Sequence, residues 1–332
     1  MRTILCRRLG VELPIVQAPI GGAAGPILAA AVSNAGGLGM LAPWSADIAT
    51  LRQQIHQTRA LTDRPFGVNL VLAFQQEERL EVCLEEGVTI LSFFWGDPAT
   101  SAARARAGGA TTIFHTVASG EEARRAVGCG VDVVVAQGWE AGGHVRGSVA
   151  TLPLVSAVVD AVGPATPVVA AGGIADGRGL AAVLCLGAAG AWIGTRFLAS
   201  TEAIVHPRYR DLILGARETD TVHTHVFNIG WPDAPHRVLR NSTVEAWEAA
   251  GSPPPGRRPR EGEVVATSVS RGPIQRYRSY TPTPDAEGDI DALSLWAGQG
   301  VGLVSHVQPA GDIVRDIAED ARATLRRLQA LV

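Results

Sequence analysis

A histidine at the end of a glycine-rich segment is the residue of this chain best suited to move a proton. It is His144, which closes residues 137–144 (QGWEAGGH) directly after an apolar run. An imidazole exchanges protons near neutral pH, and neighbouring glycines leave the backbone accessible. A lone histidine is more often structural, but this position favours a catalytic or substrate-positioning role. For Glu140, a role as a second acid and a helix-cap or surface role remain equal alternatives.

Two further glycine-containing segments are suited to binding phosphate. Residues 171–177 (AGGIADG) and 194–197 (GTRF) each follow an apolar run and lead toward a helical pattern. Glycine lets backbone N–H groups approach a phosphate oxygen, and the start of a helix adds a positive dipole. Tight turns are the alternative explanation. Because both segments have the pattern, we predict that together they bind one phosphate.

Eight short apolar runs can position these residues. Runs of Val, Ile, Leu and Phe are typical of parallel strands buried on both faces. They span residues 15–18, 38–41, 66–70, 89–93, 112–116, 132–136, 167–171 and 191–194. Helical patterns fill the gaps, so the chain is predicted to be an α/β protein, a (β/α)₈ TIM barrel rather than an open sheet. In this fold the chemistry collects on loops after the strands, where all three segments fall.

The pattern predicts three parts in the chain. Residues 1–200 form the barrel. Residues 201–291 look irregular, with scattered aromatic residues and the run SPPPG, and are expected to lie over the barrel mouth. Residues 292–332 contain an amphipathic helix, expected at 312–331, that completes the barrel wall.

Composition excludes several classes of function. The formal net charge is −3, which gives no electrostatic case for nucleic acid or an acidic membrane. All 29 basic residues are arginine, so the chain cannot form a lysine Schiff base or a complete Walker A loop. No apolar segment is long enough to span a membrane, and no signal peptide is evident.

The cysteines and a histidine pair give no sign of a metal site. The four cysteines stand far apart, and Cys83, Cys129 and Cys185 are expected to be buried thiols in a reduced, cytoplasmic setting. His223 and His225 form an HxH pair, but no third ligand is near in sequence. We therefore expect surface histidines and no metal.

Other strand ends offer weaker candidates for a binding site. The first strand leads into residues 17–22 (QAPIGG), whose backbone can run along a flat ring. Asn69 ends the third strand, and its amide can bind a ring or a phosphate. His115 ends the fifth strand and can reach a phosphate oxygen. For each of these, a structural role is an equal alternative.

In combination, these segments resemble the nitronate monooxygenases, formerly called 2-nitropropane dioxygenases. The resemblance rests on residues 14–22, 35–39, 66–70, 140–144, 170–177, 194–197 and 297–299. It implies a TIM barrel with non-covalently bound FMN, no metal, and oxidation of alkyl nitronates by dioxygen. His144 matches the family histidine, as base or orienting group. The implied FMN contacts are Ala18, Pro19, Ile20, Asn69, His115, Gln137, Gly142, Gly143, Ala171, Gly172, Gly173, Gly194 and Thr195.

Some positions depart from the family, and other functions remain open. His115 stands where some members have a lysine near the flavin phosphate, and Arg146 lies one place later than an arginine found in other members. The alternatives are an FMN-dependent enoyl-acyl-carrier-protein reductase using NAD(P)H, which shares the histidine motif, and a flavin-binding protein without catalysis. The predicted partners are a nitronate and dioxygen. The oligomeric state is open, with a homodimer as one alternative.

Overall fold

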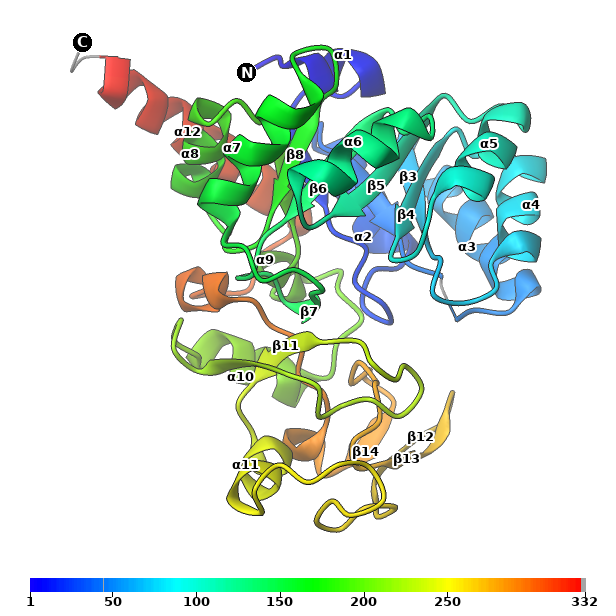
Figure 1. Cartoon of the computed structure of the whole chain (residues 1–332), viewed down its shortest axis with the longest axis vertical. Helices are drawn as coiled ribbons and strands as arrows, with labels where there is room; N and C mark the ends of the chain where they lie inside the picture. Colours follow the sequence, from blue (N-terminus) through cyan, green and yellow to red (C-terminus); the bar gives the residue numbers. More distant parts are fainter. Residues whose placement is uncertain (44, 330–332) are drawn as a thin grey trace.

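Eight parallel strands form the centre of the protein in a computed structural model that describes residues 1–43 and 45–329 (Figure 1). The strands are β1 (Ile15–Gln17), β2 (Gly39–Leu41), β3 (Phe66–Val71), β4 (Ile90–Phe94), β5 (Thr112–Val117), β6 (Val133–Gln137), β8 (Val168–Ala171) and β9 (Gly190–Ile193). They pair in the order β1-β9-β8-β6-β5-β4-β3-β2. The predicted TIM barrel is confirmed, and each strand lies within two residues of its predicted bounds.

Backbone hydrogen bonds between the first two strands close the barrel. The Leu38 N–H donates to the Ile15 carbonyl at 2.9 Å, and the Gln17 N–H donates to the Leu38 carbonyl at 2.9 Å. The side chains inside the barrel form one apolar cluster that includes Val16, Phe114 and Trp192. A second, larger cluster lies between the strands and the surrounding helices. Burial on both faces explains why the strands are continuous apolar runs.

A ring of helices covers the outside of the barrel. After the short α1 (Ile4–Leu9), the ring consists of α2 (Pro26–Asn34), α3 (Ile48–Leu61), α4 (Glu77–Glu85), α5 (Ala99–Ala107), α6 (Gly120–Gly128), α7 (Thr151–Val162) and α8 (Gly177–Cys185). Local signals set their starts: Pro26 is the first residue of α2, and the Asp176 carboxylate accepts the Gly179 N–H at 3.1 Å as the N-cap of α8.

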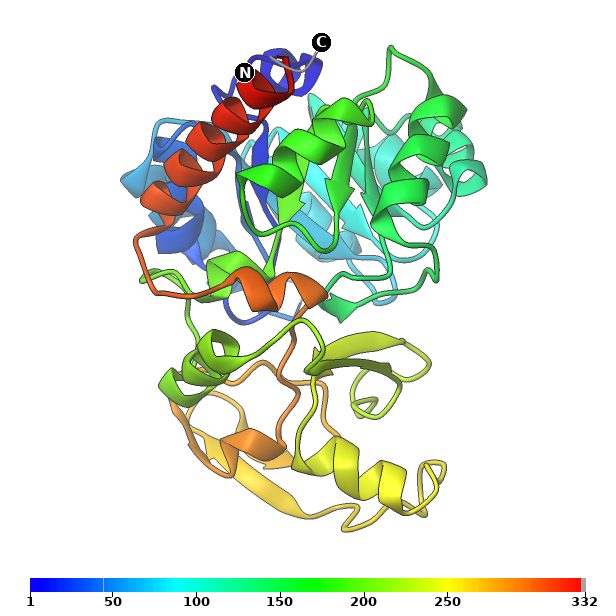
Figure 2. The same ribbon diagram turned by 90° about the vertical axis from the view of Figure 1, so that its left-hand side faces the viewer.

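The last helix of the wall comes from the far end of the chain. Helix α12 (Ala310–Gln329) packs against α8 and α2, so it takes the eighth helical position of the barrel (Figure 2). It begins two residues before the predicted start at Asp312, and the predicted end at Leu331 lies outside the described residues. The wall of the barrel therefore includes a helix that follows the lid in sequence.

Residues 201–291 are more regular than their sequence suggests, and we call residues 201–309 the lid. The lid contains α10 (Pro207–Gly215), β10 (Thr221–Thr224), β11 (His236–Leu239), α11 (Ser242–Ala249), β12 (Val264–Ser268), β13 (Gly272–Gln275) and β14 (Ala286–Gly288). Short 3₁₀ turns follow at Ile290–Ala292 and Gln299–Leu303, and α9 (Thr195–Leu198) leads into the lid from β9. The strands form two small sheets, one of β13-β12-β14 and one that joins β10 and β11 to a strand of the barrel loops.

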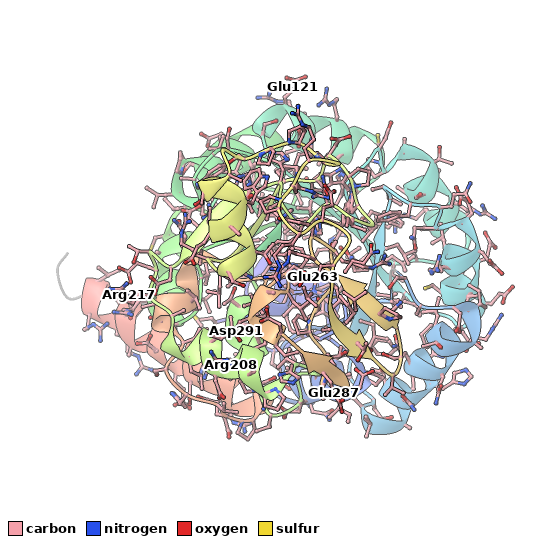
Figure 3. All side chains as sticks on the ribbon, turned by 90° about the horizontal axis from the view of Figure 1, so that it is seen from below. Glu121, Arg208, Arg217, Glu263, Glu287 and Asp291 are labelled. Atoms are coloured by element: carbon pink, nitrogen blue, oxygen red, sulfur yellow. The ribbon has the colours of Figure 1, made fainter. Side chains whose placement is uncertain are left out.

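The lid covers the end of the barrel where the strands finish. In Figures 1 and 2 it lies below the barrel, and from the lid side it overlies the barrel centre (Figure 3). Within the lid, an exposed ion pair joins α10 to the 3₁₀ turn at Ile290–Ala292, since Arg208 Nη2 lies 2.7 Å from Asp291 Oδ2.

Two of the cysteines differ from expectation. All four cysteines are free thiols, but Cys129 is half-buried and Cys185 is exposed, so the prediction of buried thiols holds only for Cys83 among the three. Both exceptions lie at helix C-termini, where the chain turns out to solvent before the next strand. Burial raises the pKa of the Cys83 thiol to about 12.

Within the described residues, no helix combines the length and apolar character that crossing a membrane requires.

Gly177 tests how the last helix docks. A Cβ atom at this position would lie 2.2 Å from the Ala321 backbone nitrogen, in the contact between α8 and α12. Gly177→Ala should therefore lower the free energy of unfolding by roughly 1–3 kcal/mol, as overpacking does. Gly128→Ala, at the open end of α6, is the matched control. Equal urea midpoints for the two variants would contradict this close packing.

Candidate functional site

A cavity of about 780 Å³ lies between the barrel mouth and the lid. Its volume falls in the range of sites for cofactors and small ligands. All predicted site residues except His115 line it, namely Ala18, Pro19, Ile20, Asn69, Gln137, Gly142, Gly143, His144, Ala171, Gly172, Gly173, Gly194 and Thr195. The loops after β1, β3, β6, β8 and β9 therefore converge on one space.

Three glycine segments meet at one side of this cavity. Gly173 has a φ of 71°, which favours glycine, whereas Gly194 has a φ of −106°. A Cβ atom at Gly194 would meet only Ala18 Cβ, at 3.5 Å, so this position opens toward the cavity. The third segment comes from the lid, since the Gly298 N–H donates to Thr195 Oγ1 at 3.0 Å. The two predicted phosphate segments lie together, with a lid segment beside them.

A short strand holds His144 at the cavity wall. Residues Gly143–His144 form β7, which pairs antiparallel with β11 of the lid so that His144 lies opposite His236. The Gln137 amide donates from Nε2 to the His144 carbonyl at 3.1 Å. The backbone of His144 is thus fixed from the lid and from the end of β6.

Aromatic rings surround the His144 side chain. The Trp231 ring stacks on the imidazole with centroids 4.0 Å apart, and the Trp296 ring lies at 5.2 Å. Trp95 approaches edge-on at 6.4 Å. Within the described chain neither ring nitrogen of His144 forms a hydrogen bond, and Nε2 is buried. The imidazole is held in place by packing and is available to a ligand.

Burial keeps His144 neutral. Loss of hydration lowers the pKa of the imidazole well below 6.5, and the nearby His236 lowers it further. His144 is only half-buried by surface area, because it faces the cavity, and yet protein atoms surround the ring closely. At neutral pH it therefore offers one N–H donor and one nitrogen lone pair rather than a positive charge.

His236 is a structural neighbour with a fixed tautomer. Its Nε2 accepts the Phe227 N–H at 3.2 Å, so Nδ1 carries the proton and donates to the Ala234 carbonyl at 2.9 Å. The side chain is fully buried, and burial lowers its pKa to about 4. A positive charge beside His144 is thus avoided in the neutral pH range.

Glu140 is a helix cap. Its Oε2 accepts the Thr151 backbone N–H at 2.8 Å and its hydroxyl at 2.9 Å, at the first turn of α7. Of the alternatives left by the sequence, the contacts support the helix cap. The loop that ends in His144 is therefore tied to the helix that follows it.

His115 faces away from the cavity. Successive side chains of a strand point to opposite faces, and its neighbour Thr116 is the β5 residue that lines the cavity. His115 is buried on the outer side of the barrel, and Nδ1 has no hydrogen-bond partner among the described residues. The predicted contact with a phosphate is left without support because the strand parity is wrong for it.

The HxH pair lies outside the cavity lining. His223 packs its ring on Trp139 with centroids 4.0 Å apart, and His225 is exposed. No group of three potential metal-binding His, Cys, Asp or Glu side chains occurs in the described part of the chain. Of the two histidines, His223 therefore has a packing role against Trp139.

The lid supplies wall residues that the sequence did not indicate, namely Trp231, Trp296, Arg271, Arg278 and Tyr280. It also supplies Gly298, which lies in a segment of the family resemblance but was not predicted to line the site. The aromatic residues after residue 230 are scattered along the sequence, and nothing in their spacing shows that Trp231 meets His144. The barrel supplies the predicted half of the site, and the lid supplies the other half.

The structure is that of a (β/α)₈ protein with a cavity at the loops that follow the strands. The family model for nitronate monooxygenase matches residues 2–78 and 71–320. The chain is 32% identical to a nitronate monooxygenase of Pseudomonas aeruginosa, with 95% of this chain and 98% of that protein covered. The chain belongs to the nitronate monooxygenase family, a family of oxidoreductases.

Other relatives have different names. The chain is 35% identical to a (3aS,4S,5R,7aS)-5-hydroxy-7a-methyl-1-oxo-octahydro-1H-indene-4-carboxyl-CoA dehydrogenase of Mycobacterium tuberculosis, covering 100% of this chain and 99% of that protein. Among solved structures, FabK from Thermotoga maritima matches with a TM-score of 0.85 and 35% identity over all of both chains. A nitroalkane oxidase from Streptomyces ansochromogenes matches with a TM-score of 0.77 and 30% identity over 98% of this chain and 99% of that one.

The buried histidines make stability depend on pH. Burial lowers the pKa of His115 and of His236 from 6.5 to about 4, so the unfolded chain binds more protons than the folded one below pH 6.5. Stability should therefore fall as pH drops from 6.5 toward 4, by roughly 1.4 kcal/mol per pH unit for each histidine. The free energy of unfolding is measured with urea between pH 7 and pH 5. Most carboxyl groups titrate below this range, so the change reports on the histidines. A constant free energy over that range would contradict the burial of both rings.

Proposed function

We propose that this chain binds FMN in the cavity and oxidises alkyl nitronates with dioxygen. The observation that carries the proposal is the neutral imidazole of His144, which has no hydrogen-bond partner among the described residues and lies on the wall of a cavity that glycine segments also border. Membership of the nitronate monooxygenase family supports the same reaction class.

The donors at one side of the cavity fit a flavin phosphate. Backbone N–H groups of Gly172-Gly173 and Gly194-Thr195 would hold it, because neither segment has a side chain at the glycine to block close approach. Asn69, Gln137 and the backbone of residues 18–20 would then surround the ring. When bound, FMN supplies the electron acceptor that passes electrons to dioxygen.

His144 suits a substrate that is already a nitronate. A neutral imidazole can donate one hydrogen bond to a nitronate oxygen, and Trp231 and Trp296 hold the ring in a fixed orientation. Because its pKa is well below 6.5, the same imidazole is a weak base toward a carbon-bound proton. We therefore expect nitronates to be oxidised faster than the corresponding neutral nitroalkanes.

A second function is favoured by the relatives named above. A flavin-dependent dehydrogenase or reductase acting on a thioester would use the same barrel, and the relative with a carboxyl-CoA substrate in its name is 35% identical. An enoyl-acyl-carrier-protein reductase using NAD(P)H belongs to this alternative. His144 does not separate the two functions, because a hydrogen bond to a carbonyl oxygen would serve equally.

Flavin identity and substrate consumption decide between these functions. The protein is purified, the flavin is released with acid and compared with FMN and FAD, and oxygen uptake is measured with ethylnitronate. NADH and NADPH oxidation is measured in parallel with an enoyl thioester. Oxygen uptake with the nitronate supports the proposal. Recovery of FAD, or NAD(P)H-dependent thioester reduction without nitronate oxidation, contradicts it, and bound flavin without any turnover would indicate a binding protein.

The His144→Ala variant separates proton abstraction from orientation. On a nitronate the variant loses one hydrogen bond, so kcat/KM should fall by about 10-fold or less. On a neutral nitroalkane, the low pKa of His144 predicts a similarly small fall, whereas a fall of roughly 10²- to 10⁴-fold would show that His144 abstracts the carbon-bound proton. Both substrates are measured by oxygen uptake, with flavin content checked by absorbance.

The matched control for that variant is His225→Ala, because His225 is exposed and does not line the cavity. It should retain the activity of the unchanged protein on both substrates. Unchanged kinetics in His144→Ala with full flavin content would remove His144 from the mechanism.

Gly194→Val tests the phosphate segments. Its backbone conformation accepts a side chain, so the barrel should fold, but a valine there would occupy the space in front of the Thr195 N–H. We expect most of the bound flavin to be lost, with the circular dichroism spectrum retained. Gly128→Val, in open space at the end of α6, should keep its flavin. Gly173→Val should also lose flavin, with added backbone strain at its positive φ. Full occupancy in both cavity variants would place the phosphate elsewhere.

A further inference from the structure

Two arginines of the lid line the same cavity as His144. They are Arg271, in the turn between β12 and β13, and Arg278, which follows β13. Both are exposed, and neither forms an ion pair with a carboxylate in the described chain. In contrast, their neighbour Arg276 is buried and paired with Glu263 at 2.8 Å.

The charge on the cavity wall is unbalanced. Among its described residues the side chains that carry full charges are Arg271, Arg278 and Asp47. The Asp47 carboxylate is engaged at the N-terminus of α3, where Oδ1 accepts the Thr50 N–H at 2.7 Å. An anion in the cavity would therefore meet two guanidinium groups and one carboxylate that is already hydrogen-bonded.

The backbone connects Arg278 to the aromatic wall around His144. Arg278 forms an isolated bridge with Ile229, and the Ser279 N–H donates to the Ile229 carbonyl at 2.9 Å. Ile229 lies two residues before Trp231, whose ring stacks on the His144 imidazole. A substrate bound at His144 would therefore lie against the same cavity wall that carries Arg278.

Arg271 reaches the opposite side of the cavity mouth. Its Nη2 donates to Ser45 Oγ at 3.2 Å, in the loop between β2 and α3. This contact holds the guanidinium across the mouth and uses only one of its five N–H donors. The remaining donors can form a paired contact with the oxygens of a carboxylate or phosphate.

We propose that Arg271 and Arg278 bind an anionic group at the end of the substrate away from the reacting carbon. The substrate class is an organic molecule that carries a carboxylate or a phosphate beyond the part held at His144. A short carboxylated nitronate and a phosphate-bearing coenzyme A thioester share this chemistry. The inference relies on the proposed function in taking this cavity as the active site.

Variants of both arginines test the site in the purified full-length protein. Arg271→Gln and Arg278→Gln, alone and together, are compared with Arg257→Gln, an exposed arginine of the same lid that does not line the cavity. Oxygen uptake gives KM for propionate 3-nitronate, which has a carboxylate, and for ethylnitronate, which has no charged tail. Calorimetric titration gives the Kd of coenzyme A, whose phosphates are the other source of the anion.

Each arginine should contribute about 2- to 5-fold, as expected for an exposed ion pair. The double variant should therefore raise the KM for propionate 3-nitronate or the Kd of coenzyme A by roughly 4- to 25-fold, and the probe that responds identifies the anion. The KM for ethylnitronate and all values for Arg257→Gln should stay unchanged. Added salt should weaken binding of the responding probe to the unchanged protein and affect the double variant less.

Two results would overturn the proposal. One is a double variant that binds both anionic probes as tightly as Arg257→Gln does. The other is an equal loss with ethylnitronate, which would indicate a structural effect on the lid. If the protein oxidises no nitronate at all, the proposed reaction fails, but the coenzyme A titration still decides whether the arginines bind an anion.

Discussion

The antiparallel pairing of β7 with β11 is the contact on which the site depends. It joins a barrel loop to the lid through backbone hydrogen bonds and sets His144 opposite His236. Without this register, His144 would end a mobile glycine segment, and Trp231 and Trp296 would have no fixed ring to pack against. One two-residue strand therefore determines where the imidazole lies, which aromatic rings surround it and how strongly it is desolvated.

Desolvation then determines the chemistry that the imidazole can perform. The tautomer of His236 is fixed by two backbone hydrogen bonds, so its ring presents no charge to His144 at neutral pH. Because the aromatic wall replaces water, a hydrogen bond from His144 to a substrate oxygen is stronger than it would be in solvent. Under the proposed function, this environment suits a substrate that arrives as an anion better than one that needs a strong base.

The barrel and the barrel half of the site could be predicted from the sequence, and the lid half could not. Parallel strands buried on both faces leave continuous apolar runs, so all eight strands and the glycine segments after them are readable. A strand of only Gly143 and His144 leaves no pattern at all. His115 and Thr116 are adjacent in one strand, and only packing shows which of them faces the cavity. The contact of Trp231 with His144 depends on lid strands whose pairing is long-range.

The position of α12 has a consequence for how the chain is made. The helix that fills the last gap in the barrel wall follows the whole lid in sequence, so a ribosome releases it only after residues 201–309. Until then the grooves of α8 and α2 that receive α12 are exposed apolar surface. The barrel wall can therefore close only after the lid has been synthesised.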